Sequence, residues 1–160
     1  MKVKSRHHLK GSDARKIIAK IEPFLGDSSR LRRASLEMAI SDEGVDLIFI
    51  DGRPLMMIVE EQPFFTVLGA IELMPTKRLV VVDAGAVRFV VNGADIMKPG
   101  IVSADPEIAV GDLVVIMEVR HKKPLAIGRA LVAGTEMKGE GKAVKSLHHV
   151  GDAIWKGLEE

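Results

Sequence analysis

The sequence contains no cysteine and no tyrosine, and it has only five phenylalanines and one tryptophan among 160 residues. The absence of cysteine excludes disulfides, thiolate metal sites and cysteine nucleophiles, and is typical of a protein in a reducing compartment. No run of about 18 apolar residues occurs, as a membrane-spanning helix requires, and the first residues lack the apolar core of a signal peptide. We therefore expect a cytoplasmic protein that has no membrane partner.

Positive charge is concentrated at the start of the chain, although the net charge is only +1. Up to Arg33 there are ten Lys or Arg residues and three acidic residues, whereas the remainder has 13 and 19. Such a block predicts a polyanionic partner docked on one side, because phosphate neutralisation supplies most sequence-independent nucleic-acid affinity. A solvated basic surface is the alternative interpretation.

The first half of the chain reads as a basic helix followed by an exposed turn. Ser12 is placed as an N-cap, and the apolar spacing predicts a helix over residues 13–22. Pro23 and Gly26 interrupt this pattern. The next residues form a basic turn containing Arg30, Arg32 and Arg33.

Three short apolar runs then predict a three-stranded antiparallel meander. The runs cover residues 35–40, 45–50 and 55–59, and Asp51-Gly52 between the last two is a strong two-residue hairpin signal. Pro63 ends the meander, and Thr66 then caps a short helix that carries Val67, Leu68, Ile71 and Leu73. The stretch Met74-Pro75-Thr76 is the expected domain boundary.

The second half begins with a strand-to-helix corner. Residues 80–82 are β-branched and predict a strand, and Asp83 stands where a helix would begin. A two-turn helix over residues 84–91 would bury Ala84, Val87 and Val91, and Asn92-Gly93 would end it. Two further strands are expected at 112–119 and 125–132, beyond a loop over residues 93–100.

The order of these elements resembles a PUA domain, the small barrel that many tRNA- and rRNA-handling proteins use to hold RNA. The resemblance is carried by the run AGAVRFVVNGADIMKPGI and by a closing segment with His148-His149, Gly151-Asp152 and Ile154-Trp155. The basic leading half and the terminal Trp narrow the resemblance to the family of the malignant T-cell amplified sequence proteins, their archaeal counterparts and ligatin. Within this family, the sequence resembles the archaeal proteins more than the others. The resemblance implies an α+β fold in which residues 1–75 form a small basic α+β domain. Residues 76–160 would form the PUA pseudo-barrel, a mixed β-barrel with short helices.

The same resemblance implies a non-enzymatic RNA-binding protein of translation, with no catalytic residues and no cofactor. Such a protein would engage the small ribosomal subunit and tRNA during initiation or recycling, and relatives pair with a density-regulated protein. Two alternatives stay open. The chain could be a tRNA- or rRNA-binding accessory of an RNA-modification enzyme, or a PUA-like protein-interaction domain that does not bind RNA.

Expected RNA contacts are the cations of both halves together with the helix-following loop of the barrel. They are Arg30, Arg32, Arg33, Arg88, Asn92, Gly93, Ala94, Lys98, Pro99, Gly100, Arg120, Lys122, Lys123 and Arg129. Because aromatics are scarce, shape and backbone recognition are favoured over base stacking. Phe49, Phe64, Phe65 and Phe89 are expected in the core, and Trp155 is expected to pack the last segment onto the barrel.

Motifs for other chemistry are weak. The pairs His7-His8 and His148-His149 are adjacent in sequence, so their side chains point apart on a strand and seldom chelate one metal. The glycine-rich run over residues 134–142 fails the P-loop spacing and reads as a flexible turn. No metal ligands are therefore assigned.

Overall fold

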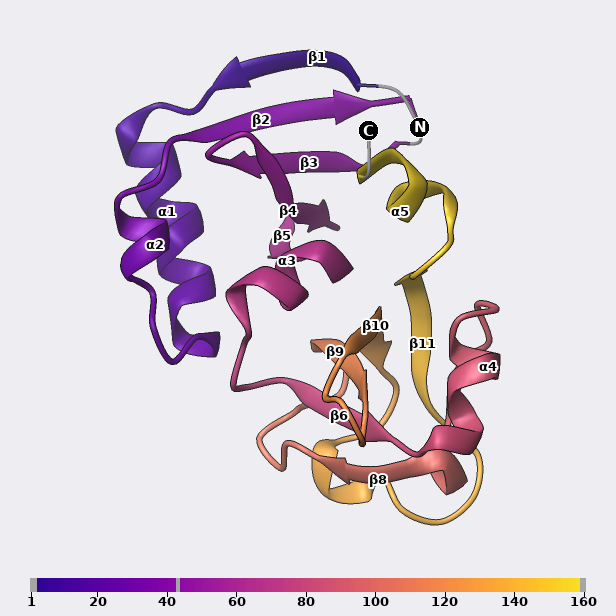
Figure 1. The fold of residues 1–160 in the computed structure, drawn as a ribbon. Coiled ribbons are helices and arrows are strands. Elements are labelled where there is room, and N and C mark those ends of the chain that lie inside the picture. The colour runs from indigo at the N-terminus through magenta and orange to yellow at the C-terminus, as the bar shows by residue number, and fades with distance from the viewer. Residues whose placement is uncertain (1–2, 43, 159–160) are drawn as a thin grey trace.

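The computed structural model describes residues 3–42 and 44–158. It contains a five-stranded sheet, in the upper part of Figure 1, and a six-stranded, nearly closed sheet in the lower part. In the described part of the chain, no helix is long and apolar enough to cross a membrane. The predicted α+β class is confirmed.

All neighbouring strands of the first sheet are antiparallel and follow chain order. They are β1 (Val3–His8), β2 (Leu36–Ser41), β3 (Asp46–Ile50), β4 (Arg53–Val59) and β5 (Gln62–Phe65). The central three strands were predicted, and the hairpin at Asp51-Gly52 has positive φ at both residues (49° and 82°), as a type I′ turn requires.

A meander of only three strands was wrong, because β1 and β5 extend it. All six residues of β1 are exposed, so the strand lacks the alternation that marks a half-buried strand. β5 follows a tight turn at Glu60-Glu61, where both residues have positive φ. Glutamate is not a turn signal, and the sequence therefore concealed this hairpin.

Four helical segments belong to the first half. They are α1 (Gly11–Ile21), η1 (Glu22–Phe24), α2 (Ser29–Arg32) and α3 (Val67–Leu73). Ser12 is not the N-cap of α1, since Lys10 occupies that position without a side-chain cap. The Thr66 cap is confirmed, because its Oγ1 accepts the Gly69 N–H at 3.0 Å. The expected basic turn at Arg30 to Arg33 is largely the one-turn helix α2.

The second sheet runs in the order β7-β11-β10-β9-β6-β8, and only the β6–β9 pair is parallel. Its strands are β6 (Leu79–Val82), β7 (Ile96–Met97), β8 (Ile101–Ala104), β9 (Leu113–Glu118), β10 (Pro124–Ala130) and β11 (Lys142–His149). Its helical segments are η2 (Ala84–Ala86), α4 (Val87–Val90), η3 (Lys98–Gly100), η4 (Gly134–Glu136) and α5 (Ala153–Leu158). The expected loop over residues 93–100 therefore contains β7 and η3, and β11 is a long strand that the sequence did not reveal.

One hydrophobic cluster spans both sheets. Leu113, Val115 and Ile127 of the barrel pack with the buried residues of β2 to β5 and α3. A second cluster fills the barrel itself. Trp155, which was expected to pack the last segment onto the barrel, packs against the first cluster, to which both sheets contribute.

A fully buried histidine joins the two halves. The Nε2 atom of His148 accepts the Val67 N–H at the start of α3 (3.2 Å), so Nδ1 carries the proton and donates to Asp152 (2.9 Å). Burial acts to raise the pKa of Asp152, but hydrogen bonds from His148 and from two backbone N–H groups outweigh it and hold that pKa below its ordinary value. His148 is therefore a structural residue that links α3, β11 and α5.

Candidate nucleic-acid interface

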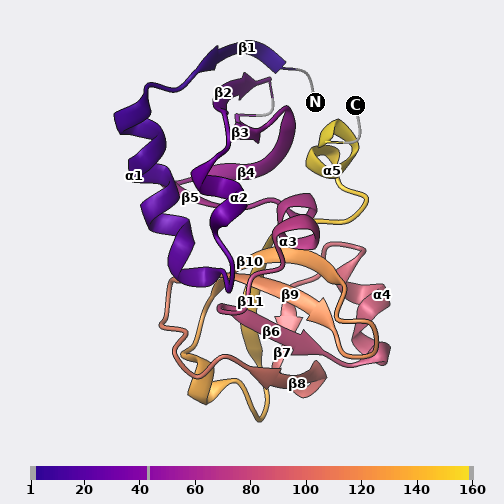
Figure 2. The ribbon, with the colours of Figure 1, turned by 60° about the vertical axis from the view of Figure 1, so that its left-hand side comes forward.

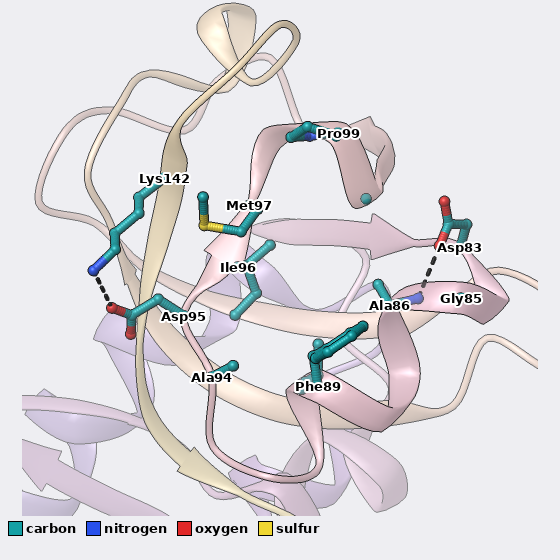
Figure 3. Close-up of a pocket in the computed structure, with 12 residues that line it drawn as sticks. Asp83, Gly85, Ala86, Phe89, Ala94, Asp95, Ile96, Met97, Pro99 and Lys142 are labelled. Carbon is teal, nitrogen blue, oxygen red and sulfur yellow. Dashed lines mark hydrogen bonds and ion pairs between the residues drawn. The ribbon is translucent and has the colours of Figure 1, made fainter.

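An open pocket of about 660 Å³ lies where the barrel sheet fails to close. The sheet ends in edge strands β7 and β8, and η3 crosses directly from one edge to the other while η2 and α4 form the opposite wall (Figure 3). The pocket is lined by Asp83, Gly85, Ala86, Phe89, Val90, Ala94, Asp95, Ile96, Met97, Pro99, Gly100 and Lys142.

The lining is mostly apolar and is accessible to solvent. Phe89 is 53% exposed and Met97 is 46% exposed, and both side chains border the pocket. The prediction that Phe89 belongs to the core was wrong. Val90 takes the buried position of α4 at 2% exposure, and one step along a helix turns Phe89 toward solvent. Ala84, expected to be buried, is also exposed, whereas Val87 and Val91 are half-buried.

Backbone contacts fix the walls of the pocket. Asp83 caps η2 by accepting the Ala86 N–H at 2.9 Å, which confirms the predicted cap, and its own N–H donates to the Gly100 carbonyl at 2.9 Å. A Cβ atom on Gly100 would lie 3.1 Å from the Cβ of Ala86, so glycine lets η3 approach η2 closely. The Lys98 N–H donates to the Gly141 carbonyl at 2.8 Å.

One ion pair lies at the rim of the pocket. Lys142 Nζ is 3.2 Å from Asp95 Oδ2, and Asp95 also accepts the Ser146 N–H at 2.9 Å. This backbone hydrogen bond lowers the pKa of Asp95; burial opposes it and Lys142 adds to it, so that the pKa lies below the ordinary aspartate value. Asp95 is therefore anionic near neutral pH and holds the β7 edge against β11.

The structure places one group of predicted contacts at this end of the barrel. Ala94, Pro99 and Gly100 line the pocket, and the Arg88 guanidinium lies 4.7 Å from the centroid of the Phe89 ring. Gly93 has φ +88°, as the predicted helix end required. Asn92 and Lys98 lie in the same stretch, beside the pocket lining.

The β9–β10 hairpin carries the next group. The Val119 N–H donates to the Val82 carbonyl at 3.0 Å, so this hairpin adjoins the start of the pocket wall, and the hairpin cations Arg120, Lys122 and Lys123 are exposed. Glu118 accepts the backbone N–H groups of His121 and Arg120. Burial acts to raise the pKa of Glu118, and these amides outweigh it and lower the pKa.

The remaining predicted cations lie elsewhere and are mostly engaged. Arg30 pairs with Glu72 at 3.2 Å and Arg32 pairs with Glu22 at 2.7 Å, whereas Arg33 is exposed. Arg129 is half-buried, donates to the Gly111 carbonyl at 2.8 Å and pairs with Glu60 of the β4–β5 turn at 3.3 Å. It therefore connects the two sheets.

Sequence reasoning missed Phe89, Met97, Asp95 and Lys142 as pocket residues. A signal for Phe89 was present, since Val87, Val90 and Val91 already supply the apolar side of a two-turn helix and leave position 89 outside. Lys142 gave no comparable signal in the sequence, because it directly follows a glycine-rich run that reads as a turn. Its place at the pocket depends on the pairing of β11 with two residues of β7, which only the structure shows.

The six-stranded, nearly closed barrel sheet with its short helices places the chain in the class of PUA-domain proteins. The PUA domain family matches residues 78–151. A solved structure of a hypothetical protein from Pyrococcus horikoshii OT3 is similar over 96% of this chain and 99% of its own length, with a TM-score of 0.87 and 36% identity.

The particular family follows from relatives that match over most of their length. An uncharacterized protein of Methanocaldococcus jannaschii is 39% identical over 97% of this chain and 98% of the relative. Translation machinery-associated protein 20 of Saccharomyces cerevisiae is 30% identical over 96% and 92%. Malignant T-cell-amplified sequence 1 of Rattus norvegicus is 25% identical over 84% and 77%. The chain belongs to this family of PUA-domain proteins, as the sequence resemblance indicated.

Proposed function

We propose that this protein binds RNA in translation, engaging the small ribosomal subunit and tRNA during initiation or recycling. The PUA domain and the translation-associated relatives support an RNA-binding role in translation. The proposed role is recognition without catalysis, in the cytoplasm. A partner resembling the density-regulated protein is part of the proposal.

The observation that carries the proposal is the chemistry of the barrel pocket. An exposed ring and a thioether border an open cavity, and the cations Arg88, Lys98 and Lys122 lie on the segments around it. An unpaired base offers an apolar face to such a pocket, while its backbone offers phosphates to the cations.

The first test measures salt-dependent binding of the full chain to small ribosomal subunits and to initiator and elongator tRNA. The variants Lys98→Gln and Lys122→Gln should each weaken binding to all sequences modestly and flatten the salt slope by about 0.7 to 0.9 per lost phosphate contact. Lys156→Gln, on the exposed side of α5, is the matched control. An unchanged salt slope in the first two variants would contradict their assignment.

The wild-type result separates the remaining alternatives. Saturable binding to small subunits supports the proposed function. Binding to tRNA alone would favour an accessory of RNA modification. Absence of binding to either would favour a protein-interaction domain.

A further inference from the structure

Helix α1 presents a strongly basic solvent face. Ile18 and Ile21 are buried against the first sheet, and Ala14 and Ile17 are half-buried beside them. At 100° per residue, the opposite arc carries Arg15, Lys16 and Lys20, all exposed. Lys16 and Lys20 are one turn apart and therefore project from the same side of the helix.

Ion pairing distinguishes the cations of this face from those of α2. Among the residues that the structure describes, no carboxylate forms an ion pair with Lys10, Arg15, Lys16 or Lys20, which we define as the α1 basic face. The only acid in α1 is Asp13, in the first turn. By contrast, Arg30 and Arg32 of α2 are paired with glutamates. Most of the N-terminal cations without an ion pair among the described residues therefore lie on α1 or at its start, and Lys4 and Arg33 are the others.

The α1 basic face extends along the whole helix. Arg15 folds back toward its start, since a Cβ atom on Gly11 would lie 3.3 Å from Arg15 Nη1. At the other end, Lys20 lines a groove of about 270 Å³ between α1, β5 and the barrel. The four cations are thus spread from the β1–α1 junction, at Lys10, to the groove between the two sheets, at Lys20.

The α1 basic face lies far from the barrel pocket. In Figure 1 and in the turned view of Figure 2, α1 lies on the left of the molecule and α4, which forms the pocket wall, lies on the right. The same short RNA segment would not contact both surfaces.

We propose that the α1 basic face is a second RNA-binding surface, which holds the phosphate backbone of a segment other than the one at the barrel pocket. This inference rests on the proposed RNA-binding function. The exposed arc contains lysine, arginine, small residues and one acid, Asp13, with no aromatic or large apolar side chain. Protein interfaces usually depend on aromatic and other apolar anchors, whereas phosphate contacts require only cations. RNA therefore fits this face better than an acidic protein does.

The test compares two charge-matched double variants of the full chain, Lys16→Gln/Lys20→Gln and Lys138→Gln/Lys156→Gln. All four positions are exposed, so melting temperatures should be unchanged. With small ribosomal subunits and a tRNA transcript as probes, the α1 variant should lower the salt slope by about 1.5, for two phosphate contacts, and the control should not. Hydroxyl-radical footprints should show that the α1 variant exposes a stretch of RNA different from the one exposed by Phe89→Ala.

Each result distinguishes this inference from the proposed function. Wild-type binding with the same slope in both double variants, or one common footprint for the α1 and Phe89 variants, overturns the second surface and leaves the function standing. Failure of the wild type to bind RNA overturns both. Loss of poly-glutamate binding in the α1 variant, with an unchanged RNA slope, assigns the face to an acidic protein instead.

Discussion

At the scale of single residues, Phe89 decides whether the barrel pocket stacks on bases. Because its ring is 53% exposed, Phe89→Ala should leave stability nearly unchanged. If the ring stacks on a base, the substitution should weaken RNA binding by about 1 to 3 kcal/mol. Leu131→Ala is the matched control, since Leu131 is 42% exposed and does not line the pocket. Equal RNA affinity of the two variants in a fluorescence-anisotropy titration would rule out stacking at Phe89.

Gly93 is the residue that packs the helix-ending turn against β11. Its φ is +88°, and a Cβ atom there would lie 2.9 Å from His149 Nε2. Gly93→Ala therefore carries both the left-handed backbone cost of about 1 to 2 kcal/mol and a steric clash. Gly139→Ala has positive φ in open space and carries only the first cost. Urea unfolding should show Gly93→Ala to be clearly less stable than Gly139→Ala, and equal midpoints would contradict the clash.

At the scale of elements, Asp152 holds the junction between β11 and α5. It accepts His148 Nδ1–H at 2.9 Å and the N–H groups of His149 and Trp155 at 2.9 and 2.7 Å. Asp152→Asn leaves one oxygen for these donors and turns an NH₂ group toward one of them, so it should cost about 1 to 3 kcal/mol of unfolding free energy. Urea unfolding at neutral pH measures this loss, and a variant as stable as the wild type would contradict it.

The acid dependence of stability follows from the same carboxylate. The folded-state pKa of Asp152 is below its ordinary value of 3.8, so its stabilising contribution is complete above that value and is lost as pH falls through the lowered pKa. Denaturation midpoints measured from pH 6 downward, to about pH 2, should therefore fall less steeply for Asp152→Asn than for the wild type. Parallel acid profiles would show that another group controls the loss.

The helices and strands were predictable where burial or turn geometry requires particular residue types in the sequence. The caps at Thr66 and Asp83 and the turn at Asp51-Gly52 were found because their residue types match their geometry. β1 escaped detection because it is wholly exposed, and β5 because its turn is Glu60-Glu61. The pocket could not be assembled in advance, since it depends on β11 closing against β7.

At the scale of the whole molecule, the shared core predicts that the two sheets unfold together. Leu113 is 2% exposed and belongs to the barrel, yet it packs in the cluster of the first sheet. Separated halves would expose this cluster to water, which is why the binding experiments above use the full chain. Leu113→Ala should cost about 2 to 5 kcal/mol and lower the stability of both sheets equally.

Two probes test this cooperativity. Trp155, the single tryptophan, packs against the first sheet's cluster, while far-ultraviolet circular dichroism reports on all the secondary structure. In wild type and in Leu113→Ala alike, the two denaturation curves should coincide, because the first cluster is built from side chains of both sheets and neither sheet can unfold without disrupting it. Val80→Ala, inside the barrel's own cluster, is the control and should shift both curves together as well. A tryptophan transition separated from the circular dichroism transition would show that the barrel keeps its structure independently, and the pocket would then be supported by the barrel alone.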